Sequence, residues 1–146
     1  MPTCHDVAKY FLAQSSEDAG DLISNLKLQK LTYYAQGFSL ALLGRPLFQE
    51  RIEAWLHGPV VPELYRAYRR YENGPIPHPE GFDQEVLSKE ERDLLDEVYQ
   101  VYGQYSAWRL RQLTHEEAPW LESYRDGCNH EITQDALARF FRTQVN

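Results

Sequence analysis

The sequence lacks any long apolar run. None of its hydrophobic stretches approaches the roughly 18 residues that a helix needs to cross a bilayer. The first six residues, Met1–Asp6, have no basic region followed by an apolar core, which is the pattern of a secretory signal. We therefore expect a cytoplasmic protein with no membrane partner.

Cysteine is almost as scarce. Cys4 and Cys128 are the two cysteines in 146 residues, and they lie in no paired metal-ligand spacing. A disulfide framework needs a closely spaced, even set of cysteines, so this class of fold is excluded. The five histidines show no His-x-x-x-His spacing, and the segment beginning at His115 lacks the second histidine of a zinc protease helix. We expect no metal and no cofactor.

Positive charge is also in deficit, with 15 Lys and Arg against 22 Asp and Glu and a net charge of -7. A domain that grips nucleic acid through its phosphates is usually basic. The global charge therefore argues against nucleic acid as a partner. A basic protein would instead be captured faster by such a chain.

Motifs of catalysis are missing as well. There is no Gly-x-Ser-x-Gly elbow, and no glycine-rich loop stands before a Lys-Ser or Lys-Thr pair. Cys4 next to His5 is not by itself an activating arrangement. We predict that the chain is not an enzyme. The alternative is a cleft that brings His57, His115 or Glu116 within hydrogen-bond reach of one another.

Helical patterns with clear caps fill most of the chain. The strongest starts at Ser24 or Asn25 and carries apolar residues at 3–4 spacing as far as Leu43. Gly37 inside it costs about 1 kcal/mol relative to Ala, which indicates close approach of another segment. Other helix starts are predicted at Thr3, Pro62, Ser88, Ser106, Pro119 (after a Thr114 cap) and Thr133.

One hairpin is predicted near residues 46–56. Leu47-Phe48 and Ile52–Trp55 are strand-like and are separated by three polar residues. The fold class is therefore mainly α: a compact single domain, residues 1–146, of about six or seven helices around a central apolar helix, with this small β-hairpin.

Residues 53–71 contain the clearest turn and helix-start signals in the sequence. A segment carrying Trp55 runs into His57-Gly58-Pro59, and Pro62 then opens a helix. His57 is expected to hydrogen-bond and fix the turn backbone, with a contact or switch role as the alternative. Gly58 is expected to supply a backbone angle or a close approach that other residues resist. The turn would be a rigid corner that presents the following helix.

That helix is rich in tyrosine and arginine: Tyr65, Arg66, Tyr68, Arg69 and Arg70. Arg and Tyr are enriched at protein-interface hot spots, so these five are the candidate partner-binding residues. Two alternatives remain open. The arginines could be solvated or paired with the acidic stretch from Glu72 to Glu97, or they could contact nucleic acid.

Five motifs together resemble a known family, the SocA-like or Panacea domain, which also includes the phage-associated GepA proteins. The matching segments are Lys27–Gly37, Gly44–Phe48, Glu53–Trp55, Gly58–Pro62 with Tyr65, and Leu113–His115 with Pro119-Trp120. They run in order across most of the chain. Within these segments Trp55, Gly58, Pro59, His115, Pro119 and Trp120 are expected to be structural motif residues, and His57, which lies between two of the segments, is expected to be another.

The resemblance implies an antitoxin of bacterial and phage toxin–antitoxin systems that neutralises a cognate protein toxin, encoded by an adjacent gene, through direct binding. It also implies an alternative, a proteolytic adaptor that delivers the toxin to a ClpXP-type protease. It carries over no catalytic residue. Autoregulation through nucleic acid and self-association as a homo-oligomer stay open.

Overall fold

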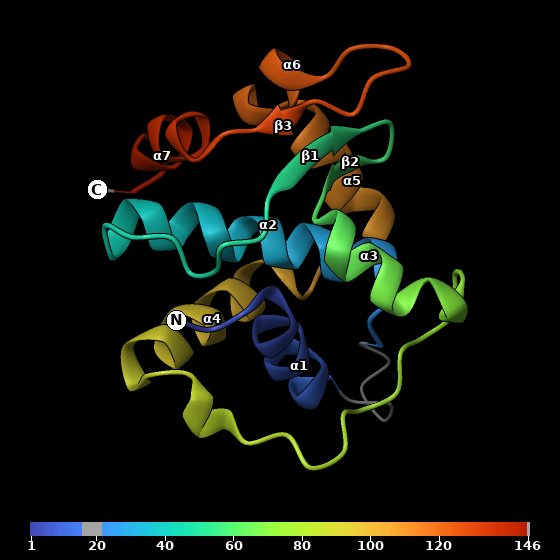
Figure 1. The fold of residues 1–146 in the computed structure, drawn as a ribbon, viewed down its shortest axis with the longest axis vertical. Helices are drawn as coiled ribbons and strands as arrows, with labels where there is room; N and C mark the ends of the chain where they lie inside the picture. The colour runs from blue at the N-terminus through green and yellow to red at the C-terminus, as the bar shows by residue number, and fades with distance from the viewer. Residues whose placement is uncertain (16–21, 146) are drawn as a thin grey trace.

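The computed structural model describes residues 1–15 and 22–145 and is mainly helical (Figure 1). The predicted fold class is confirmed. Residues 16–21 of the loop predicted over 14–21 lie outside the described residues. The elements, in chain order, are α1 (Cys4–Gln14), α2 (Asn25–Leu42), β1 (Ile52–Trp55), β2 (Gly58–Val60), α3 (Pro62–Tyr68), the 3-10 helices η1 (Arg69–Tyr71) and η2 (Gln84–Val86), α4 (Lys89–Tyr102), α5 (Ala107–His115), α6 (Ala118–Ser123), β3 (Glu131–Ile132) and α7 (Gln134–Arg142).

Helix α2 is the centre of the molecule, as its apolar pattern predicts. Figure 1 shows it crossing the middle, with α7 and the sheet on one side and α1 and α4 on the other. Gly37 explains how α7 comes so close, because a Cβ at this position would overlap the ring of Phe141, which is fully buried. The close approach predicted for Gly37 is confirmed.

Side-chain caps hold the helix starts where the sequence predicts them. Thr3 and Ser88 each form a complete capping box, in which the cap hydroxyl and the N3 carboxylate satisfy each other's backbone N–H groups. Ser24, Ser106 and Thr133 also cap their helices. The Thr114 cap is wrong. Thr114 is buried inside α5, where its hydroxyl donates to the Arg111 carbonyl.

The sheet has three short antiparallel strands in the order β2-β1-β3. Strand β1 pairs with β2 in the register Glu53 opposite Val60 and Trp55 opposite Gly58, and with β3 through Ile52 opposite Ile132. The hairpin therefore lies at 52–60. The prediction of Leu47-Phe48 as its other strand is wrong.

Gln36 of α2 explains that error. Its side-chain oxygen accepts the backbone N–H groups of Leu47 (2.7 Å) and Phe48 (3.3 Å), and its Nε2 donates to the Phe48 carbonyl (2.9 Å). One buried amide thus replaces a partner strand. The backbone of this segment is satisfied by a helix rather than by β1.

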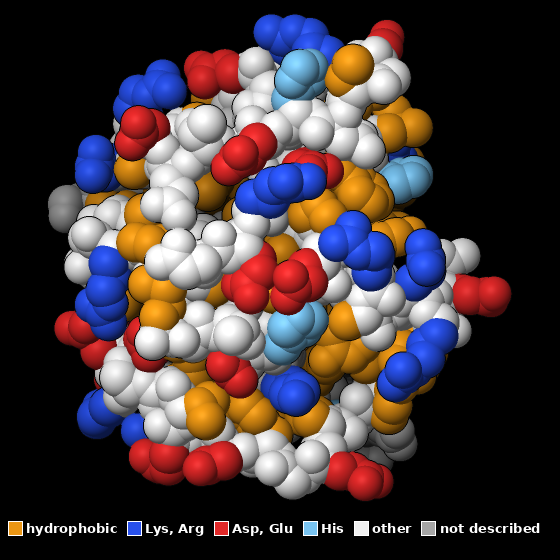
Figure 2. Space-filling model, viewed as in Figure 1, with side chains coloured by type: hydrophobic (Ala, Val, Ile, Leu, Met, Phe, Trp, Pro, Cys, Tyr) orange, Lys and Arg blue, Asp and Glu red, His pale blue; other side chains and the backbone are white. Residues whose placement is uncertain are grey.

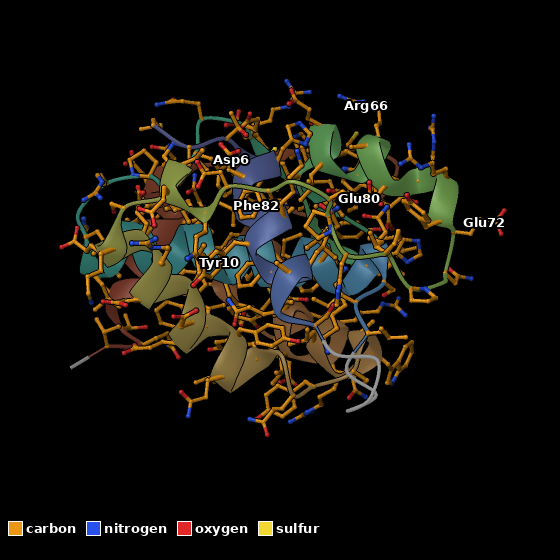
Figure 3. All side chains as sticks on the ribbon, turned by 90° about the horizontal axis from the view of Figure 1, so that it is seen from below. Asp6, Tyr10, Arg66, Glu72, Glu80 and Phe82 are labelled. Carbon is orange, nitrogen blue, oxygen red and sulfur yellow. The ribbon has the colours of Figure 1, made fainter. Side chains whose placement is uncertain are left out.

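The proline-rich connector after η1 is packed, as predicted. Ile76 is buried and donates its N–H to the Ile23 carbonyl at 2.9 Å. Figure 3 shows the connector passing over α1, with Phe82 close to Tyr10. Among the helices in residues 1–15 and 22–145, none is both long enough and apolar enough to cross a membrane.

Candidate functional site at the hairpin corner

The turn between β1 and β2 is pressed against two helices. Gly58 has a φ of +114°, which side-chain-bearing residues rarely adopt. A Cβ placed there would lie 2.9 Å from both Lys30 Cε on α2 and Thr114 Oγ1 on α5. Both properties expected of Gly58, the backbone angle and the close approach, are therefore present at one position.

Two aromatic side chains fasten this corner from α5 and α6. His115 contacts the Leu56 carbonyl through Nε2 (2.8 Å) and the Arg111 carbonyl through Nδ1 (2.7 Å). Trp120 packs against His115 in a tilted arrangement, with ring centroids 4.0 Å apart and an interplanar angle of 40°, and donates Nε1–H to the Trp55 carbonyl at 2.7 Å. Both ring nitrogens of His115 are engaged by backbone, which argues against a general-base role for it.

His57 does not fix the turn, so that prediction is wrong. Its ring is exposed, and it makes no hydrogen bond within the described part of the chain. His115 performs that task instead, from a helix 58 residues further along the sequence. Glu116 is exposed and forms no pair with either histidine among the described residues. The cleft of acid–base groups is not assembled.

Polar side chains of α2 hold the other side of the corner. Gln29 accepts the Val61 N–H at 3.0 Å and donates to Asn25 at 2.8 Å. Asn25 in turn donates to the carbonyl of Tyr65 in α3 at 3.1 Å. The start of α3 is therefore positioned by a buried amide pair, which supports the prediction of a rigid corner.

The tryptophan and proline residues of the motifs make contacts within the fold. Trp55 donates Nε1–H to Glu53 at 2.9 Å and packs edge-on against Tyr65, with ring centroids 5.1 Å apart. Pro59 is buried in β2, and buried Pro119 lies in the first turn of α6, where proline costs no hydrogen bond.

A pocket of about 300 Å³ opens beside this corner. It is lined by Ser24, Leu26, Lys30, His57, Glu72, Asn73, Ala107, Trp108 and Arg111. Lys30 is only 1% exposed, and burial, followed by the charge of Arg111, lowers its pKa to about 7. Burial and the charges of Lys30, Arg111 and His115 also lower the pKa of His57.

The five candidate partner-binding residues lie on the segment that ends at this pocket. Tyr65 and Tyr68 are half-buried and pack inward, whereas Arg66, Arg69 and Arg70 are exposed. The arginines do not pair with the acidic stretch that follows them, because no ion pair among the described residues includes them. Pairing with the acidic stretch is therefore wrong, whereas the other half of that alternative, a solvated face, agrees with the exposure of the three arginines.

A second buried group was missed from the sequence. Glu117, at the start of α6, accepts hydrogen bonds from the Tyr33 hydroxyl (2.9 Å) and the Tyr34 hydroxyl (2.8 Å). Burial raises its pKa to about 7, against the opposing effect of these two bonds. No local motif signals this arrangement, because its members are more than 80 residues apart.

Cys4 lies in a small cluster with His5 and Glu63, whose possible ligand atoms are within 4.8 Å of one another. Burial, together with the charges of Glu50 and Glu63, raises the pKa of the Cys4 thiol well above its usual value. The thiolate is the form that binds metals and attacks substrates. The raised pKa keeps the Cys4 thiol protonated, which argues against a role as nucleophile.

Comparison with known proteins places these motifs in a family. Residues 28–121 match the model described as Antitoxin SocA-like, Panacea domain. The chain belongs to this family. Gln29, Lys30, the hairpin corner, His115 and Trp120 all lie inside the matched region, so the family match covers most of the residues that build the corner, although Asn25 lies outside it.

One similar protein is the Antitoxin SocA of Caulobacter vibrioides (strain NA1000 / CB15N), which is 53% identical over 53 residues. The aligned segment covers 36% of this chain and 27% of that protein, so it spans only about a quarter of the relative's length. No solved structure matches the chain.

Proposed function

We propose that this chain is an antitoxin that neutralises a cognate protein toxin by direct contact, without catalysis. Membership of an antitoxin family supports the role. The proposed contact surface rests on one observation, the exposure of Arg66, Arg69 and Arg70. None of these arginines is paired with a carboxylate among the described residues. We call this set the arginine face.

The arginine face is free of the obvious internal partners. The neighbouring acids bind other cations: Glu90 pairs with Arg45, Asp93 with Lys89, and Glu85 with Arg92. Arg70 instead lies over the ring of Tyr71, with its guanidinium carbon 4.8 Å from the centroid. Figure 3 shows Arg66 directed away from the body of the molecule. Guanidinium groups held in this way suit carboxylates on a partner.

Apolar surface accompanies this charge. Figure 2 shows Lys and Arg side chains interleaved with hydrophobic ones on the side of the molecule where α3 lies in Figure 1. Across the pocket, Trp108 is 61% exposed, and Arg111 lies 5.0 Å from its ring centroid. A stable complex buries about 800 Å² on each partner. Such an area would need more than α3 alone, and the Trp108 side of the pocket offers the remainder.

The test is co-expression with the product of the adjacent gene, the expected toxin, in growing cells. The wild-type chain should restore growth, and the double variant R66E/R69E should fail to do so. Charge reversal replaces attraction by repulsion at the contact, which costs several kcal/mol. The matched control is R139E/R142E on α7, which has the same spacing, exposure and charge change.

Restored growth with R66E/R69E at wild-type protein level would overturn the arginine face as the contact. Persistent toxicity with the wild-type chain would overturn the antitoxin role for that pair. Immunoblotting of the toxin adds a further distinction. Unchanged toxin levels support neutralisation by contact, whereas loss of the toxin that requires an active ClpXP-type protease would replace it with the adaptor mechanism.

A further inference from the structure

The pocket beside the hairpin corner contains a buried lysine whose amine has no partner among the described residues and keeps its remaining accessible surface. Lys30 is 1% exposed, makes no ion pair or hydrogen bond among the described residues, and lines the pocket. Its neighbour Lys27 is also buried, but that amine donates to the Gly103 carbonyl at 2.6 Å. An unpaired buried lysine costs stability. A residue that reduces stability in this way is typical of a functional site.

The surroundings of Lys30 are cationic. Arg111 on α5 and His57 in the hairpin turn face the same pocket. Glu72 is the one carboxylate in the lining, and Figure 3 shows it at the far end of η1, with its side chain directed away from the body. His115, behind the turn, is bound to backbone carbonyls on both sides. Among the described residues, no ion pair joins Glu72 to Lys30, Arg111 or His57.

The residues that line the pocket determine which class of anion it can bind. Leu26, Ala107 and the ring of Trp108 provide apolar surface, and Lys30 is the most buried of the polar residues in the lining. A phosphate prefers several converging N–H donors, whereas most of the surface that lines this pocket is apolar. An apolar body that ends in one carboxylate matches both the walls and the amine, because its hydrocarbon part is desolvated against the walls.

We propose that this pocket binds a carboxylate carried on an apolar body, with Lys30 as its counter-ion and Arg111 and His57 at the entrance. The source could be a free organic acid or the C-terminal carboxylate of a protein chain. The site does not depend on toxin binding, because its geometry is complete within this chain. Failure of either proposal therefore leaves the other intact.

Binding of a carboxylate at Lys30 should be accompanied by proton uptake. With its pKa near 7, the Lys30 amine is mostly neutral at pH 8, and a carboxylate placed beside it would restore the charged form. Binding at pH 8 should therefore take up about one proton at this amine. A site built from surface arginines alone would take up none.

The experiment titrates the 15N-labelled chain with phenylacetate and follows the amide signals of Lys30 and Gly58 and the indole signal of Trp108. Calorimetry at pH 8 in two buffers of different ionisation enthalpy then counts protons. We expect phenylacetate to bind at least tenfold more tightly than neutral phenylacetamide, and more tightly than inorganic phosphate. Equal binding of the amide, or tighter binding of phosphate, would overturn the proposal.

Lys30→Met tests the amine itself. This variant keeps the length and apolar stem of the side chain and should be at least as stable as the wild type, so folding is preserved. It should lose at least tenfold in phenylacetate affinity and all proton uptake. Lys89→Met, at a lysine whose side chain is 83% exposed on α4, is the control and should change neither. Unchanged binding by Lys30→Met would overturn the assignment.

Two peptides separate the sources. A hexapeptide ending in a free leucine carboxylate is compared with its C-terminal amide. Tighter binding of the free acid, lost in Lys30→Met, supports a protein chain end as the ligand. If phenylacetate binds and neither peptide does, the ligand is a small organic acid. If neither phenylacetate nor the free-acid peptide shifts the pocket signals, the site does not bind carboxylates.

Discussion

At the scale of single residues, buried ionisable groups distinguish this chain from a simple apolar core. Glu117 and Lys30 both have a pKa of about 7, and in both cases burial is the main cause. They differ in whether the ionisable group has a hydrogen-bond partner. Glu117 is hydrogen-bonded by Tyr33 and Tyr34, whereas Lys30 has no such partner among the described residues. Glu117 is therefore explained by structure, and Lys30 calls for a ligand.

Glu117 makes a prediction about pH. Its pKa is raised in the folded state from an ordinary value of 4.5 to about 7, so between these values the folded chain binds more protons than the unfolded one. The free energy of unfolding must therefore fall as pH rises through this window. Glu117→Gln should remove this slope and be more stable than the wild type by roughly 2–3 kcal/mol at pH 8.

The measurement is urea unfolding of both proteins from pH 5 to pH 8. Lys30, whose pKa is lowered, contributes a slope of the opposite sign, with stability rising as pH increases above 7, but it does so equally in both proteins. Glu122→Gln, at an exposed position of α6, is the control and should track the wild type. A Glu117→Gln curve parallel to the wild-type curve would contradict the prediction.

At the scale of elements, side-chain amides of α2 set the path of the chain around it. Gln29 fixes the entry to α3, and Gln36 fixes residues 47–48. Helix α2 therefore acts both as an apolar core and as a hydrogen-bonding template. A hydropathy pattern does not distinguish these two functions, because apolar residues and polar hydrogen-bonding residues are both buried on this helix.

Gln36→Leu tests this template. The leucine side chain has a similar size but removes the hydrogen-bond partners of the buried backbone at Leu47 and Phe48. Each unsatisfied buried group costs about 1–3 kcal/mol. We expect a loss of roughly 2–4 kcal/mol in chemical unfolding. The control is Gln112→Leu at an exposed position of α5, which should change stability by less than about 0.5 kcal/mol. Equal stabilities of the two variants would argue against the template.

At the scale of the whole molecule, one helix touches nearly everything. Helix α2 packs against α1, α3, α4, α5, α7 and β2. The three tryptophans all lie on the side of the hairpin corner, in β1, α5 and α6. Helices α1 and α4 lie on the opposite side of α2 (Figure 1). Because the two sides share α2, neither can unfold and leave the other with a complete core.

The whole domain should therefore unfold in one cooperative step. Thermal transitions followed by tryptophan fluorescence, which reports the corner, and by far-UV circular dichroism, which reports all helices, should coincide. The calorimetric and van't Hoff enthalpies should also agree. Two separated transitions would show that the corner and the α1–α4 side are independent units, contrary to the predicted single domain.

The sequence predicted most elements because their signals are local. The caps at Thr3, Ser24 and Ser88 and the close approach at Gly37 follow from residue types and 3–4 spacing. The family resemblance followed from ordered motifs and is confirmed. The errors at Leu47-Phe48 and His57 share one cause, which is that the deciding partner lies on another element: Gln36 of α2 in the first case and His115 of α5 in the second. Thr114 differs, because its hydroxyl bonds within α5 to the Arg111 carbonyl.

The sequence by itself determined that this is a helical, acidic domain of the SocA-like family, because periodicity, caps and motif order are written along the chain. Only the tertiary structure decided which polar residues matter. It buried Lys30 without a counter-ion, gave the turn-fixing role to His115, and left the arginine face exposed. The physical reason is that charge and hydrogen-bond satisfaction depend on which groups meet in space.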